Sequence, residues 1–366
     1  MRYVIFGAGG IGGTIAAALR LASASVCVIA RGPHLAAMQT SGLQFVTPSQ
    51  TRQLALHALA DPAQAAISDD DVVILAMKSQ HTAAALTALR AATDAEPAIV
   101  CAQNGVDNER QALRLFAHVY GMEVVMPTTH LHPGEVEVHT ENVYGLLDLG
   151  RYPSDAPNAG VAACDSLATR IAADLSDAGF SSVARPDIMA WKYRKLVRNL
   201  GNGVALLIGD SAATRDIVRI LRGEATAVFA AAGIHAIGDA QYRVRTDQLD
   251  RSLNNNQRRQ GSSTLQSVLR QADSVETDYL NGEIVLLGRL YGVQTPVNAY
   301  IQALAAHCVG TAHRGRQIAP GSLDGVQLLH TARDLLQAAA NAHLHAHAAV
   351  ATDVPAQTLN ASEPAQ

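Results

Sequence analysis

The feature that most constrains the fold is a glycine-rich stretch near the start of the chain. The sequence "MRYVIFGAGGIGGTIAAAL" passes from an apolar run through Gly7, Gly9 and Gly12 into an Ala/Leu pattern with helical spacing. These glycines form the pattern G-x-G-x-x-G between a predicted strand and a predicted helix. The first permits a tight turn, the second leaves room for a pyrophosphate, and the third lets helix and strand pack closely. The alternative is a glycine-rich turn of another kind of α/β protein. The predicted cofactor-binding residues here are Gly7, Ala8, Gly9, Gly10, Ile11 and Gly12.

Residues 1–185 alternate between short Val/Ile-rich runs and Ala/Leu stretches. This alternation is typical of βαβ units around a doubly wound parallel sheet, and we expect residues 1–185 to form a Rossmann-type domain. Turn residues near Pro133–Gly134 predict a hairpin. The predicted strands are Tyr3–Phe6, Ser25–Ala30, Val72–Met77 and Ala98–Ala102, and the predicted helices are Ile11–Leu21, Thr82–Ala92, Asn108–His118 and Val161–Asp177.

Strand signals nearly vanish after residue 185. Helical spacing predicts an all-helical second domain over residues 186–335. Residues 336–366 form a C-terminal extension, of which we expect about the last dozen residues to be disordered. The predicted helices are Ile188–Leu207, Ala213–Ala232, an interrupted Ser262–Gly292 and Pro296–Cys308.

Composition excludes several classes of protein. The 366 residues carry a net charge of −4, so nothing in the charge balance favours binding to nucleic acid or to an anionic membrane. The four cysteines form no C-x-x-C pair, and no apolar run is long enough to span a bilayer. His130 and His132 alternate with other residues, as do three histidines near the C-terminus, and solvated side chains explain this better than a metal site. We therefore expect a cytoplasmic protein without a bound metal.

The type of cofactor is indicated by the residue that follows the second predicted strand. An acidic residue there would bond a ribose 2′-hydroxyl and indicate NAD, but "VCVIARGPH" places Arg31 at this position. A guanidinium suits a 2′-phosphate, so we predict NADP, the alternative being a solvated arginine. Lys78 and Asn104 follow the next two strands. They are predicted at the same edge of the sheet, although Asn104 could simply be a turn residue before glycine.

A second polar pattern lies in "WKYRKLVRNLGNGVALLIG", residues 191–209. Lys192, Lys195, Asn199 and Asn202 are spaced by three, four and three, which places them within an arc of roughly 80° on a helix. Amides can hold a carboxylate or carbonyl oxygen, and an ammonium can protonate a developing alkoxide. The alternative is a solvated face, but the apolar flanks favour a helix that borders a cleft.

These motifs together resemble those of the ketopantoate reductase family, the 2-dehydropantoate 2-reductases. The resemblance implies NADPH-dependent reduction of a small 2-oxo acid to a 2-hydroxy acid, in a cleft between a Rossmann domain and a helical domain. It identifies Lys195 as the catalytic lysine, although Lys192 on the same face stays open as the proton donor. It also allows a homodimer. The motifs, in order, are "GAGGIGG", "ARG", "MKSQ", "QNG", "KYRKLVRN", "SSTLQ", "ETDYLNG" and "GVQTPVN".

The resemblance extends to further site residues. It implies that Glu276 lies where cofactor and substrate meet. The implied substrate contacts are Asn104, Asn199, Asn202 and Ser263, and the implied cofactor contacts beyond the glycine stretch are Arg31, Lys78, Asn104 and Glu276.

Three departures from the family pattern concern the substrate pocket. Gly203 stands where the family has a second asparagine, and Asn202 is one residue early. The interval from Ser263 to Glu276 is one residue longer than usual, and "PTTHLHPGEVEVHT" replaces smaller residues. Two alternatives to ketopantoate reduction are therefore the reduction of a different 2- or 3-oxo acid and a non-catalytic NADP(H)-binding sensor.

Overall fold

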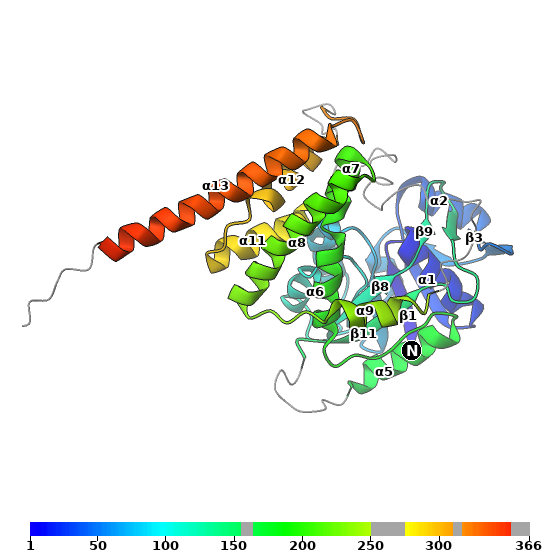
Figure 1. Cartoon of the computed structure of the whole chain (residues 1–366). Coiled ribbons are helices and arrows are strands. Elements are labelled where there is room, and N and C mark those ends of the chain that lie inside the picture. Colours follow the sequence, from blue (N-terminus) through cyan, green and yellow to red (C-terminus); the bar gives the residue numbers. More distant parts are fainter. Residues whose placement is uncertain (155–163, 250–274, 310–316, 353–366) are drawn as a thin grey trace, which may run out of the picture.

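The computed structural model describes residues 1–154, 164–249, 275–309 and 317–352. Figure 1 shows a sheet-containing part built by the N-terminal half and a helical part built by the C-terminal half. The strands are β1 (Arg2–Phe6), β2 (Ser25–Ile29), β3 (Leu43–Val46), β4 (Thr51–Leu54), β5 (His57–Leu59), β6 (Asp71–Leu75), β7 (Ala98–Cys101), β8 (Val119–Val125), β9 (Thr128–Thr129), β10 (Glu135–Val138) and β11 (Leu146–Tyr152). The helices of the sheet part are α1 (Gly10–Leu21), α2 (Gly32–Ser41), α3 (Thr82–Ala92), α4 (Asn108–Leu113) and α5 (Ser166–Asp177), with 3₁₀ turns η1 (Pro62–Ala65) and η2 (Ser79–His81). The helical part holds α6 (Ile188–Asn199), α7 (Gly201–Ile208), α8 (Ala212–Ala232), α9 (Asp239–Thr246), η3 (Glu276–Tyr279), α11 (Asn281–Tyr291), α12 (Pro296–Ala306) and α13 (Gly325–Thr352).

The main sheet has the order β11-β8-β7-β6-β1-β2-β5 within the described residues. All neighbouring strands run parallel except β8 and β11, which are antiparallel. The chain moves from β1 outward to β2 and later crosses to β6 on the other side. The carboxyl ends of β1 and β6 therefore form the switch point at which such sheets bind ligands. The predicted doubly wound sheet and helical second part are confirmed.

A second sheet, with the order β4-β3-β10-β9, was not predicted as a separate layer. Strand β10 pairs with β3 in parallel and with β9 antiparallel, so the predicted hairpin at Pro133–Gly134 joins a sheet that covers α1. Short polar strands such as β4 carry little periodicity, and their pairing depends on segments far apart in sequence.

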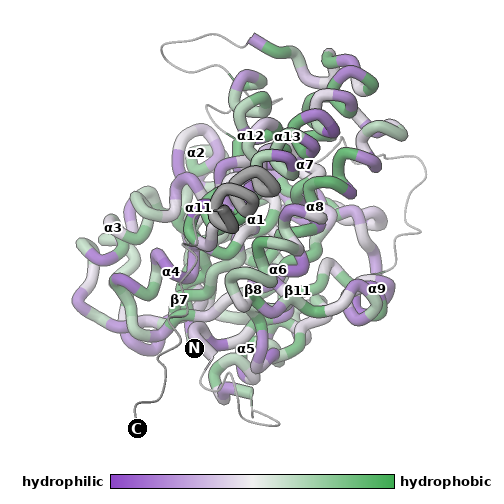
Figure 2. The backbone as a smooth tube through the Cα atoms, turned by 60° about the vertical axis from the view of Figure 1, so that its left-hand side comes forward, coloured by the Kyte–Doolittle hydropathy of each residue, from purple (hydrophilic) through white to green (hydrophobic). Residues whose placement is uncertain are grey.

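Strands β7, β8 and β11 are mostly apolar because helices cover both faces of the main sheet (Figure 2). Helices α1 and α5 pack on one face through residues such as Ile15 and Ile171, and α3 and α4 cover the other through Leu86 and Ala112. Helix α9 is largely polar and is joined to β11 by an ion pair of 2.5 Å between the buried Arg245 and Asp148. Polar docking of this kind explains why α9 has no clear apolar signal in the sequence.

A buried carboxylate links α8 to the start of α12. Glu224 of α8 is 5% exposed and accepts bonds of 2.9 Å from the backbone N–H groups of Val297 and Asn298, and one of 2.7 Å from the Asn298 side chain. Because α12 begins with Pro296, these are the first N–H groups that the helix leaves without an internal partner. Glu224 therefore caps α12 from a neighbouring helix.

We expect Glu224→Ala to lower the free energy of unfolding by roughly 2–4 kcal/mol, because it leaves buried donors without acceptors. Urea unfolding followed by circular dichroism would measure the loss. Arg219→Ala is a suitable control, since Arg219 lies on the same helix but pairs with Asp216 at the surface. A Glu224→Ala loss no larger than the control's loss would contradict this role.

Helix α13 runs past the domain boundary predicted at residue 335, so the expected extension begins inside a helix. Its Ala-rich sequence has high intrinsic helix propensity, which sustains a helix without a regular apolar face. Figure 1 shows α13 extending well beyond the other helices. The segment expected to be disordered lies outside the described residues. Of the helices that the structure describes, none combines the length and apolar character needed to cross a membrane.

Candidate active site

The glycine loop between β1 and α1 has the geometry that its sequence predicts. Gly7 has a φ of +100°, and a Cβ at this position would lie 2.9 Å from the backbone nitrogen of Met77. A Cβ on Gly12 would lie 2.0 Å from the carbonyl oxygen of Gly7, whereas a Cβ on Gly9 would meet nothing within 4 Å. Gly7 and Gly12 are thus required by the turn and the close packing, and Gly9 leaves an open face at the start of α1. This arrangement fits a pyrophosphate.

Arg31 follows β2 at the same edge of the sheet. It precedes α2 and is exposed, and its side chain forms no hydrogen bond or ion pair with any other residue described by the structure. An exposed guanidinium beside the glycine loop can bind a phosphate on the adenosine ribose.

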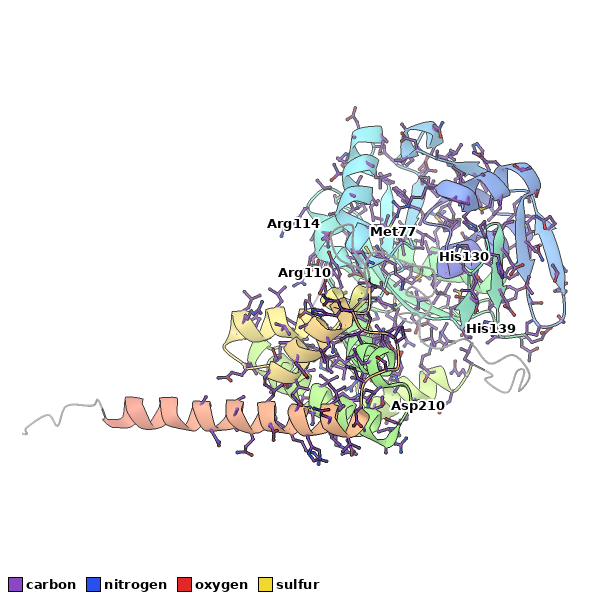
Figure 3. The ribbon with its side chains drawn as sticks, turned by 90° about the horizontal axis from the view of Figure 1, so that it is seen from above. Met77, Arg110, Arg114, His130, His139 and Asp210 are labelled. Atoms are coloured by element: carbon purple, nitrogen blue, oxygen red, sulfur yellow. The ribbon has the colours of Figure 1, made fainter. Side chains whose placement is uncertain are left out.

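His34, which was not among the predicted site residues, links the glycine loop to the turn at Gly134. His34 Nδ1 accepts a bond of 2.8 Å from the Gly134 N–H, so its Nε2 carries the proton and donates to the Ala8 carbonyl at 2.8 Å. The His130 ring packs against it with 4.3 Å between ring centroids. Figure 3 shows His130 in the sheet part. Burial, helped by the charge of His130, lowers the pKa of His34 to about 4.

The lowered pKa of His34 predicts a loss of stability in acid. A histidine whose pKa is about 4 when folded and 6.5 when unfolded stabilises the fold above pH 6.5, and this contribution is lost as the pH falls toward 4. We expect the free energy of unfolding of the wild type to decline more steeply over this range than that of His34→Gln, which does not titrate. Urea unfolding at pH 7, 5.5 and 4.5 would compare them, and parallel declines would contradict the prediction.

Three of the predicted cofactor residues meet across the two parts of the molecule. Lys78, after β6, forms an ion pair of 2.6 Å with Glu276 of η3, which is 4% exposed. Burial acts to raise the pKa of Glu276, but the charge of Lys78 and hydrogen bonds from Lys78, Ser79 and Asn104 outweigh it and lower that pKa. The Asn104 carbonyl also accepts a bond of 3.1 Å from Ser79 Oγ. Lys78, Asn104 and Glu276 thus form one cluster beside the carboxyl ends of β6 and β7.

Lys192 is buried at the carboxyl end of β7. Only 3% of this residue is exposed, and its Nζ donates to the carbonyl oxygens of Cys101 at 3.2 Å and Gln103 at 3.1 Å. It also forms an ion pair with Glu109 of α4, which is fully buried. Three acceptors match the three N–H groups of an ammonium. Lys192 therefore has a complete set of protein partners.

Lys195 lies less than one turn further along α6, against the neighbouring strand. Its Nζ donates to the carbonyl oxygen of Val124 near the carboxyl end of β8. The buried Glu123 precedes Val124 and accepts a bond of 2.9 Å from the Tyr242 hydroxyl of α9. Burial raises the pKa of Glu123, and the charge of Lys195 opposes the rise. Sequence reasoning missed Glu123, although an acidic residue inside the apolar run "GMEVVM" is a detectable signal.

The two asparagines of the predicted stripe lie on either side of a helix break. Helix α6 ends at Asn199 and α7 begins at Gly201, so the predicted single helix over 188–207 is two helices joined at Leu200. Asn199 and Asn202 are partly exposed, and neither side chain bonds another residue within the described ranges. A Cβ on Gly203 would contact Thr277 at 3.5 Å, so α7 packs against η3, which carries Glu276. Ser263 lies outside the described residues.

The two histidines named in the sequence analysis, His130 and His132, lie in the hairpin before β10. His130 Nδ1 bonds the carbonyl of Glu135 at 2.8 Å, and His132 is exposed in the same hairpin. Among the residues that the structure describes, no group of three or more His, Cys, Asp or Glu could hold a metal ion.

Figure 3 shows Met77 and Arg110 on the side of the sheet part that borders the helices. Arg110 forms an ion pair of 2.6 Å with Glu283 of α11 there.

Comparison with known proteins decides the family. The model of "Ketopantoate reductase PanE/ApbA" matches residues 3–154, and the model of its C-terminal part matches residues 187–308. The chain belongs to the ketopantoate reductase family. This membership makes it an oxidoreductase and confirms the resemblance.

Individual relatives cover most of the chain. A 2-dehydropantoate 2-reductase of Mesorhizobium japonicum is 26% identical over 83% of this chain and 96% of its own length. One of Pyrococcus horikoshii is 23% identical over the same shares. The ketopantoate reductase structure from Ralstonia eutropha has a TM-score of 0.69 at 26% identity, covering 84% of this chain and 98% of that one. The structure of D-mandelate dehydrogenase with NADH and anilino(oxo)acetate has a TM-score of 0.71 at 20% identity, with the same coverage, and shares the fold.

Proposed function

We propose that this protein reduces a small 2-oxo acid, 2-dehydropantoate or a close analogue, to the 2-hydroxy acid with NADPH as the reductant. The observation that carries the proposal is the location of Lys195 at the carboxyl end of β8, on the edge of the sheet that also carries the glycine loop. Membership of the family supports the reaction type.

The residues present fit a nicotinamide dinucleotide with a 2′-phosphate. The open face at Gly9 and the N-terminus of α1 would hold the pyrophosphate, and Arg31 would bind the 2′-phosphate. The cluster of Lys78, Asn104 and Glu276 would bind the cofactor where it meets the substrate. When bound, the nicotinamide supplies the hydride that the keto carbon receives.

The protein's own residues provide the proton and the orientation. Lys195, as an ammonium, polarises the keto carbonyl and donates a proton to the oxygen, which becomes the hydroxyl. The charges of Lys195 and Glu123 favour each other, and this attraction opposes the burial that raises the pKa of Glu123. Asn199, Asn202 and Ser263 hold the remaining substrate oxygens. We assign the proton transfer to Lys195 rather than Lys192, since the Lys192 ammonium is saturated by buried acceptors.

A panel of 2- and 3-oxo acids, assayed by the loss of NADPH absorbance, tests the proposal. We expect the highest kcat/KM for 2-dehydropantoate or a 2-oxo acid of similar size. A preference for a different oxo acid would support the second candidate, which is favoured by the displaced Asn202 and the break at Leu200. Nucleotide binding without turnover of any member would indicate a sensor and reject the enzyme.

A further inference from the structure

Lys192 contacts both flanks of the loop that displays Asn104. This loop, residues 102–107, joins β7 to α4. The Lys192 ammonium bonds the carbonyl of Cys101 before the loop, that of Gln103 at its start, and the carboxylate of Glu109 after it. The Lys192 side chain of α6 thus contacts both ends of a loop that belongs to the sheet part.

The surroundings accommodate this ion pair closely. Gly121 of β8 lies beneath it, and a Cβ there would lie 3.3 Å from both Lys192 Cδ and Glu109 Oε1. Even alanine at position 121 would press on the pair. The lack of a side chain at Gly121 therefore provides the space for two charged side chains, 3% and 0% exposed, at the carboxyl edge of the sheet.

The middle of the loop is held from the opposite side. The Asn104 carbonyl accepts bonds from Ser79 Oγ at 3.1 Å and Asn108 Nδ2 at 2.9 Å. Gly105 has a φ of +79°, and a Cβ there would lie 3.0 Å from the carbonyl oxygen of Tyr279 in η3. The conformation of the loop thus depends on η2 and η3 at its centre and on α6 at its ends.

We infer that Lys192 and Glu109 form a positioning pair that sets the location of the Asn104 loop relative to Lys195, and this inference rests on the proposed function. Lys192 lies less than one helical turn before Lys195 on α6. Any shift of Lys192 against the loop therefore alters the separation between Asn104 and the proton donor. A misplacement of about 1 Å at a reacting centre can reduce turnover by about a hundredfold.

A contribution to stability does not by itself explain why a lysine and a glutamate, rather than two apolar residues, occupy these positions. Apolar side chains of similar volume often replace a buried ion pair without loss of stability. Such side chains could fill the space between α4, α6 and β8, but they could not bond the carbonyls of Cys101 and Gln103. The double variant Lys192→Met/Glu109→Leu therefore separates positioning from stability, whereas Lys192→Met alone leaves Glu109 buried without its counter-charge.

The experiment compares wild type, Lys192→Met and the double variant in the full-length protein. We expect the Tm of the double variant to lie well above that of Lys192→Met, because no unpaired charge stays buried. Its kcat/KM for the best oxo acid should stay about a hundredfold lower than that of the wild type. Amide hydrogen exchange in residues 102–107 should become about tenfold faster or more in the double variant.

Arg2→Met is the matched control. Arg2 pairs with the buried Asp71 at 2.5 Å, at the amino ends of β1 and β6, far from the loop along the strands. We expect this variant to lose stability without a change in kcat/KM or in exchange of residues 102–107. Unchanged loop exchange in the double variant, or a kcat/KM within about threefold of the wild type, would overturn the inference. Faster loop exchange in a protein that turns over no oxo acid would support the positioning role and reject the proposed function.

Discussion

Replacing Lys195 by alanine should lower kcat by about 10²–10⁴-fold and leave the Kd for NADPH within about threefold of the wild-type value. The general acid is lost, so the developing alkoxide must take its proton from water, and proton transfer by a positioned side chain contributes about this much. Steady-state kinetics would measure kcat, and calorimetric titration would measure the Kd. Since the chemical step becomes slower, we also expect a larger primary isotope effect with NADPH deuterated at the transferred position.

Arg194→Ala provides the control on the same helix. Arg194 pairs with Asp239 of α9 at 3.2 Å and bonds the carbonyl of Ile237, so its loss tests a disturbance of α6 without loss of the proton donor. We expect its kcat to remain within about threefold of the wild-type value. A Lys195→Ala enzyme that turns over as fast as Arg194→Ala would remove Lys195 from the mechanism.

Replacing Arg31 by alanine should raise the KM for NADPH by about 10–100-fold while leaving the KM for NADH nearly unchanged. One or two charge-assisted hydrogen bonds to the 2′-phosphate would be lost, and each 1.4 kcal/mol is worth about tenfold in affinity. NADH has no 2′-phosphate, so it loses no such contact. Initial rates with both cofactors at a saturating oxo acid would measure the change in preference.

Arg52→Ala is the corresponding control for Arg31. Arg52 is an exposed arginine of β4 that bonds Gln50, and its removal changes the net charge by the same amount. We expect it to leave the KM for both cofactors unchanged. An equal loss of NADPH and NADH affinity in Arg31→Ala would show that Arg31 acts on the loop rather than on the 2′-phosphate, and the NADP assignment would fail.

Much of the fold was predictable because its main elements carry local signals. β1, α1 and α3 were predicted within one residue at each end, since buried parallel strands are continuous apolar runs and their helices have an apolar face. The second sheet was not predicted, because its strands β3 and β10 pair only after a long excursion of the chain. Helix α9 was missed because it docks through Arg245 and Tyr242 rather than through an apolar stripe.

Some parts of the candidate site could also be predicted from the sequence, and others could not. The glycine loop and Arg31 follow from residue type and position after a strand, because backbone geometry and charge are local properties. The partners of Lys192 and Lys195 could not be predicted in this way, since Glu109 and Glu123 lie far from these lysines in the sequence. Helical spacing placed Lys192 and Lys195 on one face but gave no information on which would be saturated by buried acceptors.

Three features could be predicted from short stretches of the chain: a glycine turn between a strand and a helix, a basic residue after the second strand, and a polar stripe on an otherwise apolar helix. These are consequences of backbone freedom, charge and periodicity over short stretches of chain. The packing of the folded chain places Lys192 against the carbonyls at the end of β7 and Glu109, and Lys195 against β8 beside Glu123. Such differences depend on which carbonyls and carboxylates surround each ammonium, and those groups are brought together only when the two halves of the chain pack against each other.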